Sequence, residues 1–320
     1  MSNATESQTT ITAGRGILER VLFSTVTTLP CCVFLIINGA MLFTLRSKTV
    51  FCETSRYILL YNLLFADTAV LAQSQLLYLL AAFRIRLTYP VCGVLTMLAS
   101  LTTAISPLTL VVMSLERYVA VCYPLRHATI ITIRNTRKAI FGIWAFSSLN
   151  VLARILLLLD FPFQDLENLQ MIEYCTEENL LLEPVSNLYD KVYTSFLFVS
   201  ASVIITFSYI GVMVAARSAS TDKASARKAR NTLLLHLVQL GLSLLSTMSN
   251  QLFVVISKVL SKIAVVRIQI VVYVCIIIFP RCLSALIYGI RDQTIRPVLI
   301  YHLCCHLKLS INPATNEISP

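Results

Sequence analysis

A few ionisable residues interrupt long apolar stretches of this chain, and they are its strongest candidates for chemistry. Asp67, Arg154 and Arg281 each stand alone inside such a stretch, whereas Glu116 and Arg117 are adjacent near the end of another. Charges within an apolar span are costly and are normally paired. Glu116 and Arg117 can meet each other, although two side chains that reach separately to the lipid interface are the simpler interpretation. We find no set of His, Cys, Asp and Glu with catalytic or metal-ligand spacing, so we expect no enzyme, metal or cofactor.

The composition places these charges in a membrane protein. Of the 320 residues, 57% are apolar and 13% are charged, and the mean hydropathy is +0.76. A soluble domain carries about 25% charged residues, and a disordered chain is far more polar. The net charge of +10 does not indicate nucleic-acid binding, because the basic residues lie in short gaps between apolar runs. We expect an integral membrane protein in contact with membrane lipid.

Seven apolar stretches are long enough to cross a bilayer as helices, which takes about 20 residues each. They are too long and too uniformly apolar for the alternating strands of a membrane barrel. The predicted spans are Val21–Leu45, Tyr57–Phe83, Val91–Val121, Ala139–Leu159, Val192–Ala216, Asn231–Ser257 and Ile268–Ile290. The sequence thus predicts an all-α membrane protein, a seven-helix bundle followed by a short amphipathic helix.

Basic residues predict the orientation, because cytoplasmic gaps carry an excess of Lys and Arg. That excess falls in the gaps that are cytoplasmic when the N-terminus is outside. We therefore expect an extracellular tail over residues 1–20, the membrane domain over residues 21–290, and a cytoplasmic amphipathic helix and tail over residues 291–320. Asn3 begins an Asn-Ala-Thr glycosylation sequon, which is usable only on the outer side.

The cysteines sort by compartment, because disulfides form on the oxidising side of the membrane. Cys92 and Cys175 are the two that the predicted topology places outside. Two outer cysteines permit one intramolecular pairing, so we predict a Cys92–Cys175 disulfide across the mouth of the bundle. Cys304 and Cys305 follow the last span and suit S-palmitoylation, with a free thiol pair as the alternative.

One motif is far more specific than these patterns. Residues 113–127 contain Glu116-Arg117-Tyr118 and Tyr123-Pro124-Leu125-Arg126-His127, and they resemble the end of helix three in vertebrate odorant receptors of the rhodopsin-like G-protein-coupled class. The resemblance runs from Val21 to Leu307, and the ending of the last span is similar to fish-type odorant receptors. Further matches follow in chain order: Asn38-Gly39, the run Asn62 to Asp67, Trp144, Ser208-Tyr209-Ile210, the run Lys228 to Leu237, and the run Arg281 to Asp292.

The chain departs from the class pattern at several positions. Where the class has Asn-Pro-x-x-Tyr in helix seven, this chain reads Ser284-Ala285-Leu286-Ile287-Tyr288. The usual kink is then expected from Pro280. The class proline of helix five is missing, and helix six has Leu244 and Leu245 where an aromatic residue often forms the pocket floor.

The resemblance implies an odorant receptor of the plasma membrane. It would bind a small molecule, water-soluble odorants included, in the outer half of the bundle and activate a heterotrimeric G protein of the stimulatory or olfactory type. Basic residues near the mouth, Arg154 among them, could attract anionic ligands, although the acidic loop between the fourth and fifth spans opposes this attraction. Helical spacing outward from Arg117, with analogy for the other helices, gives these pocket candidates: Thr96, Ala99, Ser100, Thr103, Tyr193, Thr194, Leu197, Thr247, Gln251, Tyr273 and Ile277.

The resemblance also implies a switch at the cytoplasmic end. At rest Arg117 would pair with Glu116, beside Tyr118; on activation it would turn toward Tyr209 and Tyr288 while helix six moves outward. The G protein would then contact a set of inner-loop residues, although the orientation rule alone accounts for most of the basic ones. That set is Leu125, Arg227, Lys228 and Arg230.

Asp67 and Arg281 form the second predicted ion pair. Arg281, Ser284 and Tyr288 lie on one stripe of a helix, so if Tyr288 faces the bundle, as the resemblance implies, Arg281 does too. In many receptors of the class the helix-two aspartate binds sodium with help from a helix-three serine, here Ser106. We hypothesise that the Arg281 guanidinium replaces sodium, the alternative being that Arg281 reaches water or a carbonyl independently of Asp67.

Two other functions remain open at this point. A rhodopsin-like receptor for a lipid, peptide, hormone or metabolite would share nearly every one of these motifs, although Tyr123 to His127 favours the odorant branch. A transporter or channel would show broken helices in two repeats, and this chain has eight glycines and no repeat.

Overall fold

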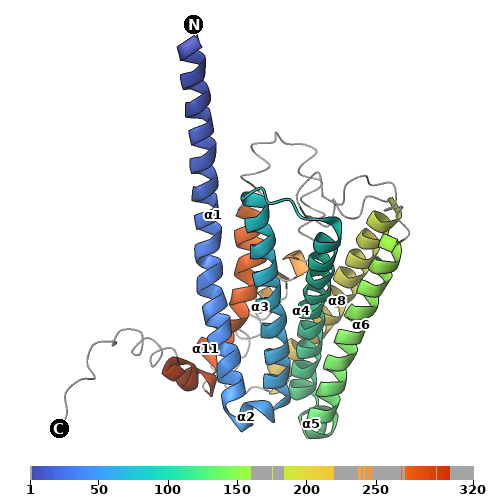
Figure 1. Ribbon diagram of the computed structural model, residues 1–320. Helices are drawn as coiled ribbons and strands as arrows, with labels where there is room; N and C mark the ends of the chain where they lie inside the picture. Colours follow the sequence, from blue (N-terminus) through green and yellow to red (C-terminus); the bar gives the residue numbers. More distant parts are fainter. Residues whose placement is uncertain are drawn as a thin grey trace, which may run out of the picture.

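The computed structural model shows a bundle of helices that run side by side, with α1 projecting beyond the others at its N-terminal end (Figure 1). The structure describes residues 2–159, 175, 184–219, 237–238, 241–242, 244–246, 268, 271–292 and 294–302. The helices are α1 (Ser2–Ser47), α2 (Thr49–Cys52), α3 (Ser55–Ala82), α4 (Tyr89–Cys122), α5 (Pro124–Ile130), α6 (Ile133–Leu159), α8 (Pro184–Ala219), the π-helical η2 (Tyr273–Ile278) and α11 (Phe279–Arg291).

The membrane spans follow the predicted order. Within the described residues, five helices are long and apolar enough to cross a bilayer, and the shorter apolar helix Tyr273–Gly289 corresponds to the predicted last span. The predicted span Asn231–Ser257 lies mostly outside the described residues. The all-α membrane architecture is therefore confirmed.

Several helices begin earlier than their apolar stretches. α1 starts at Ser2, α6 at Ile133 and α8 at Pro184, each several residues before the predicted span. Hydropathy marks the part of a helix that lies in lipid, whereas the backbone can continue its own hydrogen bonding into water on either side. Helix ends therefore lie where local backbone bonding stops, and apolar character does not mark them.

The last span changes its backbone geometry next to Pro280. Tyr273–Ile278 is a π-helical turn, and α11 follows directly with Pro280 in its first turn. Proline has no N–H to donate, so the bonding pattern before it must loosen. A π-helical turn therefore directly precedes α11 and Pro280, the residue from which the kink was expected.

The described core divides into apolar clusters at different depths. The inner cluster, toward α2 and α5, includes Met41, Leu60 and Tyr288. A second cluster lies toward the other end of the bundle and includes Leu71 and Ile278. Long apolar side chains such as Phe141 and Phe207 are exposed on the outer faces, as expected for helices in contact with lipid.

The chain continues as a short amphipathic helix after α11. Residues 295–302 are helical, and the Asp292 carboxylate accepts the backbone N–H groups of Thr294 at 2.9 Å and Ile295 at 3.3 Å. Ile295 and Leu299 are buried, whereas Arg296 is exposed. The described part of the predicted amphipathic helix is thus present, with an aspartate cap at its start.

Candidate functional site

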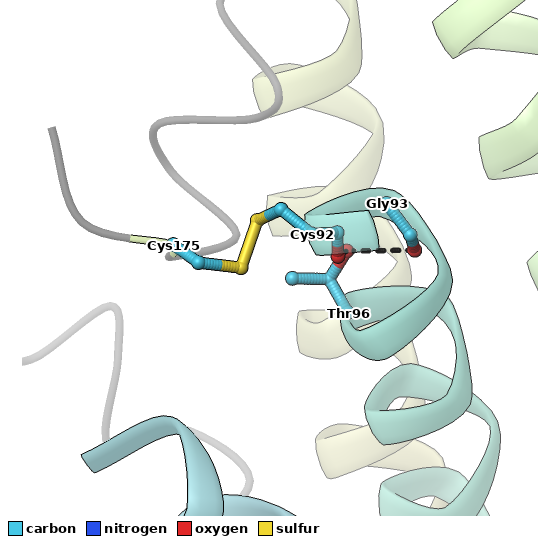
Figure 2. Close-up of a disulfide and its surroundings, with 4 residues drawn as sticks. All are labelled: Cys92, Gly93, Thr96 and Cys175. Carbon is cyan, nitrogen blue, oxygen red and sulfur yellow. Dashed lines mark hydrogen bonds between the residues drawn. A yellow bond between two sulfur atoms is a disulfide. The ribbon is translucent and has the colours of Figure 1, made fainter. Parts of the chain in front are cut away.

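The predicted disulfide is present at one end of the bundle. Cys92 in the first turn of α4 bonds Cys175, with their Cα atoms 5.6 Å apart (Figure 2). Thr96, one turn further along α4, donates its hydroxyl hydrogen bond to the Cys92 carbonyl at 2.9 Å. The disulfide therefore fixes residue 175 against the first turn of α4.

The opposite end of α4 carries the charged motif. Arg117 Nε lies 3.4 Å from Glu116 Oε2, and His127 Nε2 lies 3.8 Å from Glu116 Oε1. The Glu116 side chain is 9% exposed and that of Arg117 is 29% exposed. Arg117 Nη2 is buried and has no hydrogen-bond partner among the described residues. Among the described residues, the arginine is thus held through Nε, and its Nη2 retains free donor capacity.

Arg117 also lines a small internal cavity. The cavity has a volume of about 40 Å³ and is bordered by Ser114, Tyr209 and Tyr288 as well as by apolar side chains of α4 and α8. The resemblance predicted that Arg117 turns toward Tyr209 and Tyr288. Arg117 and both tyrosines therefore border the same cavity.

The third residue of the motif is positioned by a glycine that the sequence analysis did not single out. The ring of Tyr118 lies against Gly211 of α8 so closely that a methyl group on Gly211 would overlap Tyr118 Cε2. Tyr118 also contacts Tyr123 edge-on, with ring centroids 5.9 Å apart. Gly211 thus permits the close approach of α4 and α8 beside Arg117.

A further polar cluster at this end was also missed. Asp292, just beyond α11, accepts hydrogen bonds from Tyr57 and lies 3.3 Å from Arg56 Nη2. The Arg56 guanidinium lies over the ring of Tyr288, 5.7 Å from its centroid. Asp292 was part of the quoted helix-seven ending, but nothing in the sequence placed it against the start of α3.

The middle of the bundle contains two of the three charges that stand alone in the apolar stretches, Asp67 and Arg281. Arg281 Nη1 donates to Asp67 Oδ1 at 2.9 Å and to Ser106 Oγ at 3.2 Å. The Ser106 hydroxyl donates to the same Asp67 oxygen at 2.7 Å. Asp67 and Arg281 are each 3% exposed and Ser106 is fully buried. The structure therefore joins α3, α4 and α11 through one compact polar contact.

Asn62 forms a second polar contact between helices in the same region. Its amide nitrogen donates to Thr109 Oγ1 at 2.9 Å, and its amide oxygen accepts from Trp144 Nε1 at 3.0 Å. Because α3, α4 and α6 meet at this one side chain, two of the motifs that carried the resemblance, Asn62 and Trp144, are in direct contact.

The predicted pocket residues face several different neighbours. On α4, Thr96 is buried and Ala99, Ser100 and Thr103 are partly buried. Tyr193 of α8 stacks on Phe146 of α6, and the neighbouring Thr194 and Leu197 are buried.

The pocket residues of the last span lie toward α3. Tyr273 stacks on Tyr78 at 5.4 Å and donates to Gln75 Oε1 at 3.3 Å. Ile277 packs in the same apolar cluster as Tyr273. The neighbours of Tyr193 and those of Tyr273 therefore belong to different helices.

Arg154 differs from the role suggested for it. Its guanidinium forms an ion pair with Asp190 of α8, and its side chain is 6% exposed. Beside this pair, Tyr189 donates to Asn150 Oδ1 at 3.0 Å. Arg154 therefore links α6 to α8 through a carboxylate of the chain itself, which neutralises the charge that was expected to attract anionic ligands.

Some of the predicted site residues lie outside the part of the chain that the structure describes. Thr247, Gln251, Arg227, Lys228, Arg230, Cys304 and Cys305 lie outside the described residues. Asn3 lies within α1, and Leu125 at the start of α5 is 97% exposed. Leu125 is thus accessible at the end of the bundle that carries Arg117.

The family model for the seven-transmembrane receptors of the rhodopsin family matches residues 37–314. The chain belongs to this family. The receptor is also 32% identical to zebrafish odorant receptor 131-2 over 274 residues, which cover 85% of this chain and 83% of the relative. It is 28% identical to human olfactory receptor 1M1 over 144 residues, 44% of this chain and 45% of that protein. The resemblance to odorant receptors is confirmed, and receptors of this family are not enzymes.

Proposed function

We propose that this receptor detects an odorant and activates a heterotrimeric G protein of the stimulatory or olfactory type. The observation that carries the proposal is the similarity to odorant receptor 131-2 across 85% of the chain. The similarity extends over both ends of the bundle, because it includes most of the length of each protein. The alternative of a non-odorant ligand has no structural observation of its own in its favour.

The proposed ligand site lies in the outer half of the bundle, between the disulfide and the Asp67–Arg281 contact. Hydroxyl-bearing and aromatic residues are available at this depth on α4, α8 and η2, among them Thr103, Tyr193 and Tyr273. Apolar walls with a few polar groups suit a small neutral or weakly polar molecule. The paired Arg154 disfavours a ligand whose recognition depends on an unopposed cation.

The proposed signalling step uses Arg117. At rest Arg117 is held by Glu116 at one nitrogen, and Tyr209 and Tyr288 border the adjoining cavity. Ligand binding in the outer half would favour a state in which Arg117 exchanges Glu116 for these tyrosines and the cytoplasmic end opens. Arg227, Lys228, Arg230 and the exposed Leu125 would then contact the G protein.

We propose that the receptor acts at the plasma membrane. Its N-terminus lies outside the cell and its C-terminus lies in the cytoplasm. Support comes from the disulfide, because it lies at the same end of the bundle as the N-terminal part of α1 (Figure 1). Disulfides form on the extracellular side. In this orientation Asn3 would be available for glycosylation and Cys304 and Cys305 for acylation.

The function can be tested by measuring cAMP in cells that express the receptor. The cells are exposed to a panel of odorants, amino acids and organic acids. We expect at least one ligand to raise cAMP in cells with the parent receptor, while Arg117→Ala reaches the surface and gives no response. A ligand that binds the parent without any cAMP change would contradict the stimulatory coupling. An unchanged response of Arg117→Ala would contradict the proposed switch.

A further inference from the structure

The polar contact between Asp67, Ser106 and Arg281 does not suit a metal cation, because one of its members is itself a cation. In many receptors of this class a sodium ion lies beside the helix-two aspartate, which here is Asp67. A sodium ion needs oxygen ligands with free lone pairs. Asp67 Oδ1 accepts one hydrogen bond from Arg281 and one from Ser106, and Ser106 Oγ accepts a second from Arg281. Asp67 Oδ1 and Ser106 Oγ, two of the oxygens nearest to a sodium ion at this position, are therefore already bonded to the guanidinium.

The charge balance points the same way. The side chains of Asp67 and Arg281 are each 4% exposed, so they carry one negative and one positive charge away from solvent. A sodium ion at Asp67 would bring a second positive charge next to a guanidinium that cannot lose its proton. Repulsion between two cations is strong where water does not screen it. The site is thus neutral with Arg281 alone and would be overcharged with a metal ion.

Apolar layers lie on both sides of this contact. One turn away on the outer side, Leu71 of α3 and Ile278 of η2 belong to the same buried cluster. On the cytoplasmic side, Leu63 and Leu64 of α3 and Ala285 of α11 belong to the inner cluster. Apolar layers above and below a charge pair hinder the entry of hydrated ions, because an ion would have to shed its water to cross them.

From these observations we propose that Arg281 is the permanent internal cation of this receptor and that Asp67 binds no sodium ion. Its guanidinium provides the positive charge that a mobile ion supplies elsewhere in the class, and it does so from a covalently fixed position on α11. The stability of the receptor is consequently independent of sodium. The inference rests on the geometry of α3, α4 and α11 and does not depend on the identity of the odorant or the G protein.

The first test measures thermal unfolding of the purified full-length receptor. Sodium chloride is exchanged for N-methylglucamine chloride at a constant ionic strength of about 0.15 M. A cation that binds the folded state raises the unfolding temperature by mass action. We expect the same unfolding temperature in both salts. A higher unfolding temperature in sodium would overturn the proposal, and because no ligand is added the result is separate from the proposed function.

The second test removes the guanidinium with Arg281→Ser, which leaves Asp67 and Ser106 in place. We expect this variant to be less stable than the parent and to acquire a rise of unfolding temperature with sodium. Adding Asp67→Asn should abolish that acquired dependence, because the carboxylate is then gone. A folded Arg281→Ser variant that ignores sodium would contradict the exclusion of sodium by Arg281.

Arg154→Ser is the matched control, since Arg154 is a second buried arginine paired with an aspartate. The side chain of its partner, Asp190, is 27% exposed, so it can be hydrated without a cation. We expect no sodium dependence in Arg154→Ser. An equal sodium response in both variants would show that the effect is not specific to Asp67. Should Arg281→Ser be too unstable to purify, the salt comparison on the parent still decides the proposal.

Discussion

Two carboxylate–guanidinium contacts in this receptor differ in what they connect. Asp67 and Arg281 belong to α3 and α11, and their side chains are each 4% exposed. Glu116 and Arg117 are neighbours on α4, and their side chains are 9% and 29% exposed. The first contact can break only if two helices lose a shared interaction, whereas the second can break by rotation of one side chain. Position along the chain and depth in the bundle thus distinguish a pair that joins two helices from the pair that we propose to be switchable.

The surroundings of the two arginines strengthen this difference. Arg281 bonds two oxygen atoms at once, on α3 and on α4. Among the described residues, Arg117 forms its ion pair with Glu116, and it borders a cavity with Tyr209 and Tyr288. One guanidinium is therefore fixed by bonds to two other helices, and the other has alternative partners within reach.

The largest effect is expected from neutralising one side of the buried pair. Asp67→Asn and Arg281→Gln should each lower the free energy of unfolding by about 3–5 kcal/mol, because the remaining charge is left buried without its partner. Unfolding temperature and surface delivery measure the effect. The double variant should lose less than the sum of the two single losses. Simple additivity would show that the two residues act independently.

The second-largest loss of stability is expected from removal of the disulfide. Cys175→Ser should destabilise the receptor by about 2–4 kcal/mol and cause retention inside the cell, because residue 175 is no longer attached to the outer end of α4. Cys275→Ser serves as the control, since Cys275 is an exposed free cysteine on η2. Surface labelling of the two variants provides the comparison. Normal delivery and ligand response of Cys175→Ser would contradict a structural role for the disulfide.

A smaller loss of stability is expected at the contact between α4 and α8 beside Arg117. Gly211→Ala should destabilise the receptor by about 1–3 kcal/mol, because the added methyl group overlaps the ring of Tyr118 and must displace it. Gly142→Ala of α6 is the control, since nothing lies within 4 Å of the position where its methyl group would be. Comparison of the two unfolding temperatures and of the G-protein response measures the effect. Equal behaviour of both variants would show that the contact with Tyr118 is not constraining.

The sequence predicted those parts of the molecule that depend on local pattern. Apolar length located the described spans, and the two outer cysteines identified the disulfide. The stripe of Arg281 and Tyr288 on one helix pointed Arg281 into the bundle, where the structure places it against Asp67. The first two inferences needed only apolar length and compartment, whereas the third also used the resemblance, which implied that Tyr288 faces the bundle.

Contacts between distant segments could not be predicted in the same way. Arg154 was considered among residues that could attract anions, and its contact with Asp190 was not foreseen, because that contact depends on how α6 and α8 align. The approach of Gly211 to Tyr118 and of Asp292 to Arg56 depends likewise on rotation of one helix against another. The pocket candidates share this difficulty, because helical spacing gives a face of a helix and not the neighbour that it meets.

The smallest effect on stability should come from the switchable pair. Glu116→Gln is expected to change the free energy of unfolding by no more than about 1 kcal/mol, because Arg117 is partly exposed and can be hydrated or turn toward the tyrosines. Glu116→Gln also removes the contact that holds Arg117 in the resting state. Ligand-independent signalling should therefore rise by up to about fivefold.

His127→Gln sharpens this last prediction. His127 approaches Glu116 only to 3.8 Å and its side chain is 36% exposed, so its removal should raise basal signalling less than Glu116→Gln does. Basal cAMP, normalised to surface expression, measures both variants. If Glu116→Gln instead unfolded the receptor as severely as Asp67→Asn, depth and connectivity would not distinguish the two pairs. If it were stable but silent, Glu116 would be needed for the active state and would not restrain the resting one.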